Sequence, residues 1–467
     1  MMESIEEYVQ RAQWAARGWL RTARLQTQMA LVLGVWCLRF APVVHAAESW
    51  LTQYPIVAQR ANAACEAGQL HECEQGLLRW QNLIDGRPDI RCRLAVVEAK
   101  LGEKALALKS LQVCSRSGLD FPQLSADPSV RSLSALPGFS AAEAEYQRGS
   151  LPADHHELRY SLNDPDLLAE DVAFDSADAS FLISSVHKRK IVRIAASGEE
   201  SDFITMAQTP MWGVFALAVD ARRGVCWATT TAVSQSPPFT PADDGRSAVL
   251  KIDLRSATLM YRYELSDRGP HAFGDMTLAD DGAVYVSDGR GGGVYVIRRS
   301  HPDSLETLVK PGSFRSPQTP AVIANERALL VPDYSRGIAL VSLAPGKGIV
   351  AWLHHPPELS LSGIDGLYLQ GHTLVAIQNG TVPERILIMT VDREYRRITN
   401  WRVALARVPG LGDPTHGVIR GNEFLALVNS GWDRVDAQGV FGTDTSALPA
   451  QIWQIRLSER RLGGRRP

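Results

Sequence analysis

The segment Gly274-Asp-Met-Thr-Leu-Ala279 opens a pattern that decides how most of this chain folds. A turn follows it, then the apolar run Val284-Tyr-Val-Ser287, and after a second turn the run Gly293-Val-Tyr-Val-Ile297. Short runs rich in Val, Ile and Tyr, separated by Gly and Asp, are typical of antiparallel strands joined by tight turns. The segment therefore predicts one small meandering sheet.

The same pattern occurs six times from about residue 160 onward. The opening segments are Glu170-Asp-Val-Ala-Phe-Asp175, Phe215-Ala-Leu-Ala-Val-Asp220, Gly274-Asp-Met-Thr-Leu-Ala279, Thr319-Pro-Ala-Val-Ile-Ala324, Ile364-Asp-Gly-Leu-Tyr-Leu369 and Thr415-His-Gly-Val-Ile-Arg420. Their second residues, at positions 171, 216, 275, 320, 365 and 416, are separated by 45, 59, 45, 45 and 51 residues. A repeat of about 45 residues has the length of a four-stranded propeller blade. The sequence therefore predicts a mainly β fold, with a six-bladed β-propeller over residues 160–460.

Composition excludes several other classes of protein. The chain has 467 residues, of which 45% are hydrophobic and 21% are charged, and this balance excludes a disordered chain and a coiled coil. Its 49 basic and 51 acidic residues give a formal net charge of -2. Because no large positive field is present to attract phosphates, we expect no nucleic-acid partner.

Residues 1–46 are typical of an export signal. The ten-residue apolar run Met29–Leu38 follows three arginines, and Val44-His45-Ala46 offers small or medium residues where a signal peptidase cuts. The run is short for a membrane span, although an uncleaved membrane anchor and a buried core helix are alternatives. We expect the protein to be exported to the periplasm or secreted.

Residues 47–150 are predicted to form a helical module. Ile90–Gly102 and Glu103–Cys114 have the pattern of a helical hairpin that resembles a tetratricopeptide-type repeat. Since only one such unit is clear and about three are normally needed for stability, the next domain or disulfides would have to support the module. Its role is expected to be either a structural cap or a surface that holds a protein partner.

Four cysteines of the module agree with an oxidising compartment. Cys65, Cys73, Cys92 and Cys114 lie within fifty residues, and their spacing does not match a zinc site. Four cysteines allow three pairings. The local choice is Cys65–Cys73 with Cys92–Cys114, since each pair would join neighbouring helices across a turn.

Polar residues recur where the innermost strand of each repeat begins. They are Glu170, Asp171, Gly274, Asp275, Gln318, Asp365 and His416. In a propeller these positions meet at one mouth of the central channel, where converging carboxylates repel one another unless a cation such as Ca²⁺ neutralises them. The alternative is that these residues only form turns and cap backbone groups.

Residues 160–457 resemble the gluconolactonase, senescence-marker and strictosidine-synthase-like propellers. Glu170 in Ala-Glu-Asp-Val-Ala-Phe-Asp matches that family's Glu-Gly-Pro-x-x-Asp opening, and Asp365 in Ile-Asp-Gly-Leu matches its Pro-Asp-Gly segment. The resemblance implies a divalent metal held by a Glu, two Asn and an Asp, with the Asp also acting as catalytic acid and base. Two positions depart from the family pattern, because Gly274 and Gln318 stand where the two Asn residues are expected.

The resulting candidate metal ligands are Glu170, Asp365, Gln318 and Asp275, with Ca²⁺ as the expected ion. Asp365 and His416 are the candidate catalytic residues, His416 as a general base with Asp365 as the carboxylate that orients it. Trp432, just after a strand of the sixth repeat, is expected on the channel rim or the opposite face, either stacking on a ligand or packing between blades.

Two functions follow from this set of residues. The first is an exported, metal-dependent hydrolase of sugar lactones or esters, whose activity is in question because both Asn positions are replaced. The second is a non-catalytic propeller that binds a peptide, sugar or protein partner. Both place a small-molecule or peptide ligand at the channel mouth.

Overall fold

The computed structural model of the chain describes residues 49–84, 87–267, 269–323, 328–344, 346–442 and 448–458. The predicted export signal, residues 1–46, lies outside these described residues. Among the helices in the described ranges, none is both long enough and apolar enough to cross a membrane.

The first three blades are antiparallel sheets of four strands each, in chain order from the channel outward. Blade one contains β2 (Ala169–Asp175), β3 (Ser180–Ser185), β4 (Lys190–Ile194) and β5 (Glu200–Thr205). Blade two contains β6 (Gly213–Asp220), β7 (Val225–Thr231), β8 (Ser247–Asp253) and β9 (Leu259–Tyr263). Blade three contains β10 (Phe273–Leu278), β11 (Val284–Asp288), β12 (Gly293–Arg298) and β13 (His301–Val309). The predicted repeat openings coincide with the innermost strands.

Blades four and five have the same order. Blade four contains β14 (Ala321–Ile323), β15 (Ala328–Asp333), β16 (Gly337–Ser342) and β17 (Ile349–Trp352). Blade five contains β18 (Ile364–Gln370), β19 (Thr373–Gln378), β20 (Arg385–Val391) and β21 (Ile398–Ala406).

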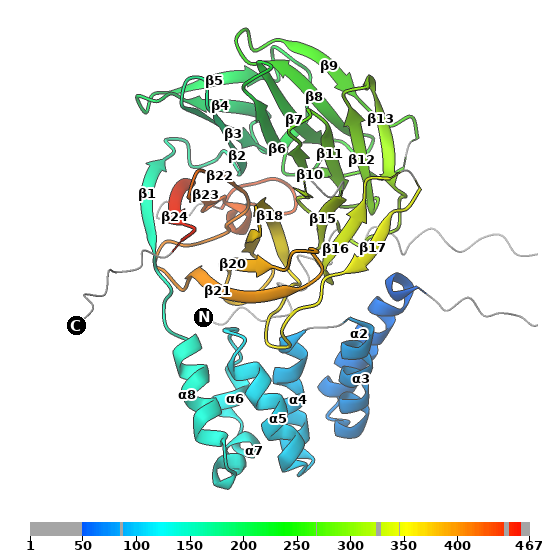
Figure 1. Ribbon diagram of the computed structural model, residues 1–467, viewed down its shortest axis with the longest axis vertical. Coiled ribbons are helices and arrows are strands. Elements are labelled where there is room, and N and C mark those ends of the chain that lie inside the picture. Colours follow the sequence, from blue (N-terminus) through cyan, green and yellow to red (C-terminus); the bar gives the residue numbers. More distant parts are fainter. Residues whose placement is uncertain are drawn as a thin grey trace, which may run out of the picture. The chain divides into compact units, whose positions relative to one another are not determined.

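Blade six is built from both ends of the propeller sequence. Its strands are β22 (Gly417–Arg420), β23 (Glu423–Val428), β24 (Gln451–Arg456) and β1 (His156–Ser161). Strand β1 pairs antiparallel with β24, with His156 opposite Ile455, and Figure 1 shows the cyan β1 beside the red β24. This pairing closes the ring and covers the edge that β24 would otherwise expose.

Neighbouring blades bury their broad sides against each other. Trp227 and Val249 of blade two pack with Phe273 of blade three, and Leu427 of blade six packs with Ile183 of blade one. Single four-stranded sheets cannot bury both sides in this way, so the repetition itself supplies the core. The predicted mainly β, six-bladed propeller with an N-terminal helical module is confirmed.

The helical module precedes the propeller. Its helices are α2 (Trp50–Glu66), α3 (Leu70–Leu83), α4 (Pro88–Lys100), α5 (Lys104–Ser115), α6 (Gln123–Ala126), α7 (Pro128–Arg131), η2 (Ser132–Ala135) and α8 (Phe139–Gly149). Disulfides Cys65–Cys73 and Cys92–Cys114 join α2 to α3 and α4 to α5, which is the local pairing among the three that the sequence allows. Cys226, in blade two, is a buried free thiol.

Candidate functional site

The innermost strands β2, β10, β18 and β22 all begin at one end of the central channel, which we call the mouth. Glu170 is the second residue of β2, Asp365 the second of β18, and His416 directly precedes β22. One ligand atom from each of these three residues lies within 4.8 Å of the other two. The structure therefore brings together three side chains that are far apart in the sequence.

His416 is almost fully buried and both of its ring nitrogens are hydrogen-bonded. Nδ1 lies 3.0 Å from the carbonyl oxygen of Glu170, and Nε2 lies 2.8 Å from Oδ1 of Asp275. The hydroxyl of Thr319 also donates to this Oδ1, at 2.6 Å. Since a carbonyl only accepts and the Asp275 oxygen already accepts from a hydroxyl, the arrangement fits an imidazolium beside a carboxylate.

The charges around His416 agree with that protonation state. Burial lowers the pKa of His416, but the hydrogen bond to Asp275 and the negative charges of Asp171, Asp275 and Asp365 raise that pKa well above its usual value. The carboxylate bonded to His416 is thus Asp275, not Asp365 as expected from the sequence.

Three further carboxyl groups at the mouth hold protons more tightly than usual. Burial raises the pKa of Glu170 to about 8, with a further rise from the charge of Asp365 and an opposing effect of His416. Burial likewise raises the pKa of Asp365 to about 6 and that of Asp171 to about 6. Four acidic groups therefore surround one imidazolium, and bound protons or a cation must neutralise the excess negative charge.

Hydrogen bonds fix one oxygen of the carboxyl group of Glu170 and one oxygen of that of Asp365. The indole Nε1 of Trp432 donates to Oε2 of Glu170 at 2.5 Å, and the amide Nδ2 of Asn379 donates to Oδ2 of Asp365 at 2.7 Å. The hydroxyl of Tyr334 in turn donates to Oδ1 of Asn379 at 3.1 Å. These hydrogen bonds fix the orientation of the carboxyl groups of Glu170 and Asp365.

Trp432 lies at the mouth, not on the opposite face. Strand β23 runs antiparallel to β22, so the chain that follows Val428 returns to the end of the channel where β22 began. The bond from Trp432 to Glu170 then places the indole beside the acidic residues.

The two positions that depart from the family pattern contribute differently. The side-chain nitrogen of Gln318 donates to the carbonyl and the hydroxyl of Ser316, at 3.2 and 2.9 Å, so this part of the amide is held in its own loop. Gly274 has no side chain, and a Cβ built on it would meet no atom within 4 Å. The structure thus leaves open space where the resemblance places an Asn.

The side chains present fit a hard divalent cation in part. Glu170 and Asp365 each have one carboxylate oxygen beyond the one held by Trp432 or Asn379, and carboxylate oxygens are preferred ligands of Ca²⁺. His416 fits less well as a ligand, because both ring nitrogens already have partners. Two carboxylates near a buried imidazolium are therefore the core of a candidate metal centre.

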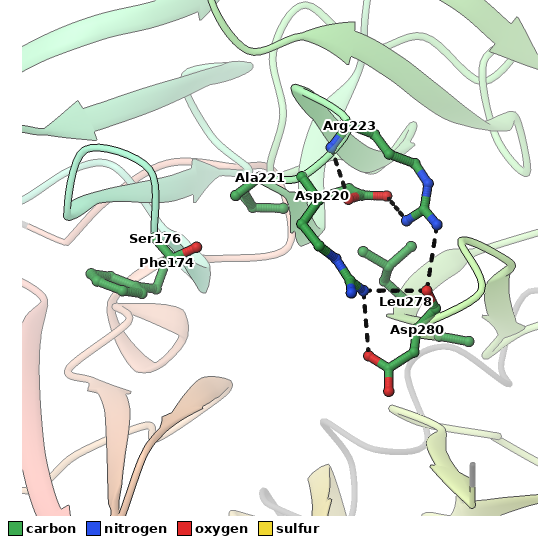
Figure 2. Close-up of a pocket in the computed structure, with 10 residues that line it drawn as sticks. Phe174, Ser176, Asp220, Ala221, Arg223, Leu278 and Asp280 are labelled. Atoms are coloured by element: carbon green, nitrogen blue, oxygen red, sulfur yellow. Dashed lines mark hydrogen bonds and ion pairs between the residues drawn. The ribbon is translucent and has the colours of Figure 1, made fainter. Parts of the chain in front are cut away.

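A cavity of about 200 Å³ lies elsewhere, where β2, β6 and β10 end (Figure 2). Its arginines are paired with carboxylates: Arg223 lies 2.6 Å from Asp220, and Arg222 lies 3.7 Å from Asp280. None of the predicted site residues lines it. Since its charges are balanced, the chemistry of this molecule is better sought at the mouth.

Comparison with known proteins gives similarities of fold. No protein-family model matches the sequence, and no curated protein matches it either. Among solved structures, a gluconolactonase from Xanthomonas campestris is 14% identical, with 66% of this chain and 97% of that chain covered and a TM-score of 0.43. A virginiamycin B lyase from Staphylococcus aureus is 12% identical, with 65% and 100% covered and a TM-score of 0.41. A glucose dehydrogenase is 13% identical, with 64% and 99% covered and a TM-score of 0.44. The six-bladed architecture itself rests on the six four-stranded sheets described above.

Proposed function

We propose that this protein is an exported hydrolase of lactones or related esters that uses a divalent cation. The observation that carries the proposal is the meeting of Glu170, Asp365 and His416 within 4.8 Å of one another at the mouth. The excess of acidic groups over the single imidazolium favours a bound cation there. Ca²⁺ is the ion that carboxylate and water oxygens suit best.

In this proposal Glu170 and Asp365 would hold the cation, which when bound would polarise the carbonyl of the ester. Asp365 is also the proposed general base, because the resemblance assigns the catalytic acid and base to this position and its carboxyl group lies beside Glu170 and His416 at the mouth. It takes a proton from the water whose oxygen bonds to the carbonyl carbon. It returns that proton to the alkoxide when the ester C–O bond breaks.

His416 has a second role in the proposal. Its charge, fixed between Asp275 and the carbonyl of Glu170, stabilises negative charge that develops on the substrate oxygen. Asp275, held by Thr319, keeps the ring in that orientation. Of the residues expected from the sequence, Gln318 is proposed only as an additional oxygen ligand.

Calcium titration calorimetry and a sugar-lactone hydrolysis assay test the proposal. We expect the wild-type protein to bind one Ca²⁺, and Asp365→Ala to bind it at least about tenfold more weakly and to lose hydrolysis. Asp280→Ala is the matched control, because Asp280 lies at the cavity of Figure 2. Absence of calcium binding in the wild-type protein would remove the basis of the proposal.

A variant designed to bind Ca²⁺ more tightly gives an independent test of the same proposal. Since a Cβ at Gly274 would meet no atom within 4 Å, Gly274→Asn can begin its side chain in open space and add an amide oxygen at this position. If the mouth binds a metal as the resemblance implies, this variant should bind Ca²⁺ roughly tenfold more tightly. An unchanged affinity would show that position 274 does not border the cation.

The second candidate function is a propeller that binds a small molecule or peptide at the mouth without catalysis. Its supporting observation is that His416 already neutralises part of the acidic charge while both ring nitrogens remain bonded. A protein partner on the helical module belongs to this proposal as well. Ligand binding that is unaffected by chelation would favour it over the hydrolase.

The disulfides of the helical module support the proposal that the protein is exported. Two disulfides within the helical module are stable in the periplasm or outside the cell, whereas the cytosol keeps thiols reduced. The apolar run Met29–Leu38 would supply the signal, or an uncleaved anchor in the alternative.

A further inference from the structure

Residues 429–442, which follow β23, lie at the mouth, and we call them the cap segment. The segment contains the short helix η3 (Trp432–Arg434) and a small turn in which Val435 pairs with Phe441. It belongs to blade six by sequence, but its contacts reach blades one and two. The cap segment thus connects three blades at the end where the acidic residues lie.

One side of the cap segment is bound to the loop that leads into β22. The backbone nitrogen of Asn429 donates to the carbonyl of Gly412 at 2.5 Å, and that of Asp433 donates to Oδ2 of Asp413 at 2.8 Å. Asn429 has a φ of 57° and Gly431 a φ of 98°. The chain therefore turns sharply on either side of Ser430, and Trp432, which follows Gly431, is directed toward the channel.

The other side is bound to blades one and two. The guanidinium of Arg434 donates to the carbonyl of Pro165 and lies 3.7 Å from Asp166, at the entrance to β2. Phe441 packs edge-on against His187 with ring centroids 4.8 Å apart. Gly439 approaches the backbone of Ser234 in blade two so closely that a Cβ would clash there. These contacts hold the cap segment on both sides of Trp432.

Trp432 itself contacts two residues at the mouth. Its indole nitrogen donates to Oε2 of Glu170 at 2.5 Å, and its ring lies 6.3 Å from that of Phe215, with an interplanar angle of 34°. The backbone carbonyl of Glu170 accepts from Thr415 at 2.7 Å and lies 3.0 Å from Nδ1 of His416. Glu170 is thus fixed at its backbone by blade six and at its carboxyl group by the cap segment.

We propose that Trp432 is a positioning residue that orients Glu170 for cation binding by occupying Oε2, which leaves Oε1 as the oxygen that contacts the ion. The inference rests on the proposed function, because it assumes that a cation binds at the mouth. Groups that hydrogen-bond to a metal ligand fix its orientation, and their loss typically lowers metal affinity by about 10–100-fold. Trp432 differs from a residue that only packs between blades, because its indole N–H binds a candidate ligand.

The variant Trp432→Phe tests the inference, since it keeps an aromatic ring beside Phe215 but removes the N–H. We expect its Ca²⁺ affinity, measured by calorimetry on the full chain, to fall about tenfold or more. Trp401→Phe, on the outermost strand β21 of blade five, is the matched control and should bind Ca²⁺ like the wild-type protein.

Terbium luminescence tests separately whether the cation binds beside Trp432. Tb³⁺ replaces Ca²⁺ at oxygen sites, and a nearby indole sensitises its emission. The wild-type protein and Trp401→Phe should show sensitised emission that Trp432→Phe lacks. If Trp432→Phe fails to fold, Arg434→Ala carries the test, because it removes an anchor of the cap segment and should weaken Ca²⁺ binding several-fold.

The outcomes separate this inference from the proposed function. If the wild-type protein binds no Ca²⁺, the proposed function fails and the inference fails with it. If the wild-type protein and Trp432→Phe bind Ca²⁺ equally well, the inference is wrong while the proposed function stands. Equal affinity in a folded Arg434→Ala variant overturns the inference in the same way.

Discussion

His416 determines the charge balance of the mouth. Its imidazole is 2% exposed and lies between the carboxyl group of Asp275 and the backbone carbonyl of Glu170. A protonated ring in this place acts as an internal cation that offsets one of the negative charges of the surrounding carboxylates. At low pH the protein can therefore stay folded without a metal. As the carboxyl groups at the mouth ionise, their mutual repulsion increases, and a bound cation stabilises the fold more.

This balance predicts that the metal-free protein loses stability as the pH rises. Glu170 has a folded pKa of about 8, above the unfolded value of about 4.3, so the folded state binds a proton that the unfolded state has released. The resulting stability is fully present below about pH 4 and is lost as the pH rises through 8. His416, whose pKa is also raised, changes stability in the same direction above about pH 6.5.

Thermal unfolding in a chelator between pH 5 and pH 9 measures the effect. We expect the Tm of the wild-type protein to fall with pH, and that of Glu170→Gln to fall by a few degrees less. Glu384, whose pKa burial raises to about 8, is present in both proteins, so its contribution cancels in the comparison. Identical pH profiles for the two proteins would contradict the assigned protonation of Glu170.

Residue types at strand openings made part of this site predictable. Glu170, Asp365 and His416 were recognisable because each precedes or begins an apolar strand of a repeat whose period is near 45 residues. The bond from His416 to Asp275 was not predictable, since cross-channel pairing depends on blade packing and not on spacing along the chain. Trp432 was ambiguous for a similar reason: its loop has no counterpart of equal length in the other repeats.

At the scale of elements, the start of β22 sets the position of His416. Gly417, the next residue, donates its backbone N–H to the hydroxyl of Tyr368 in blade five at 2.8 Å. A Cβ at Gly417 would lie 2.5 Å from the carbonyl of Leu425 and would also clash with the ring of Phe424. Only glycine therefore lets β22 approach β23 closely at this point.

We expect Gly417→Ala to destabilise the protein by about 1–3 kcal/mol, because the added methyl group forces the neighbouring strand or ring to move. Urea unfolding followed by fluorescence measures the change. Gly274→Ala is the control, since its new methyl group meets open space and should change stability little. Equal stability of the two variants would show that β22 can shift without cost.

The repeats in the sequence predict the number of blades. They do not predict that β1 is the strand that completes blade six. Six openings in the sequence correspond to the six innermost strands of the sheets. Strand β1 precedes the first opening, and nothing in His156–Ser161 shows that it pairs with β24, nearly three hundred residues later. Such closure depends on the circular arrangement of the whole ring, which a local pattern of strands does not specify.

At the scale of the whole molecule, the helical module is joined to blade five by polar contacts, some of them partly exposed. Asp120 donates its backbone N–H to the carbonyl of Val382 at 2.7 Å, and Arg407 binds both the side chain of Asp120 and the carbonyl of Gly118. The sequence predicted that disulfides or the next domain would support a module with so few repeats. The structure contains both kinds of support.

A further contact between the module and blade five is made by Arg385, which is completely buried. Its side chain is fully enclosed, with Nε 2.6 Å from Oε1 of Gln378 and Nη1 2.7 Å from the carbonyl of Ser117 in the module. Burial, with a smaller effect of Arg407, lowers its pKa to about 9, so the guanidinium still carries its charge at neutral pH. Its Nη2 has no hydrogen-bond partner among the described residues.

Loss of Arg385 should loosen the module from the propeller. Arg385→Ala leaves the carbonyl of Ser117 and the amide of Gln378 without their charged donor, and we expect a cost of about 3 kcal/mol in the free energy of unfolding. We also expect faster limited proteolysis in residues 116–122, between α5 and α6. Arg298→Ala removes a partly exposed ion pair with Glu306 in blade three and should cost less than about 1 kcal/mol. If Arg385→Ala matches Arg298→Ala in both measurements, the module is held to the propeller by its apolar contacts and not by this buried guanidinium.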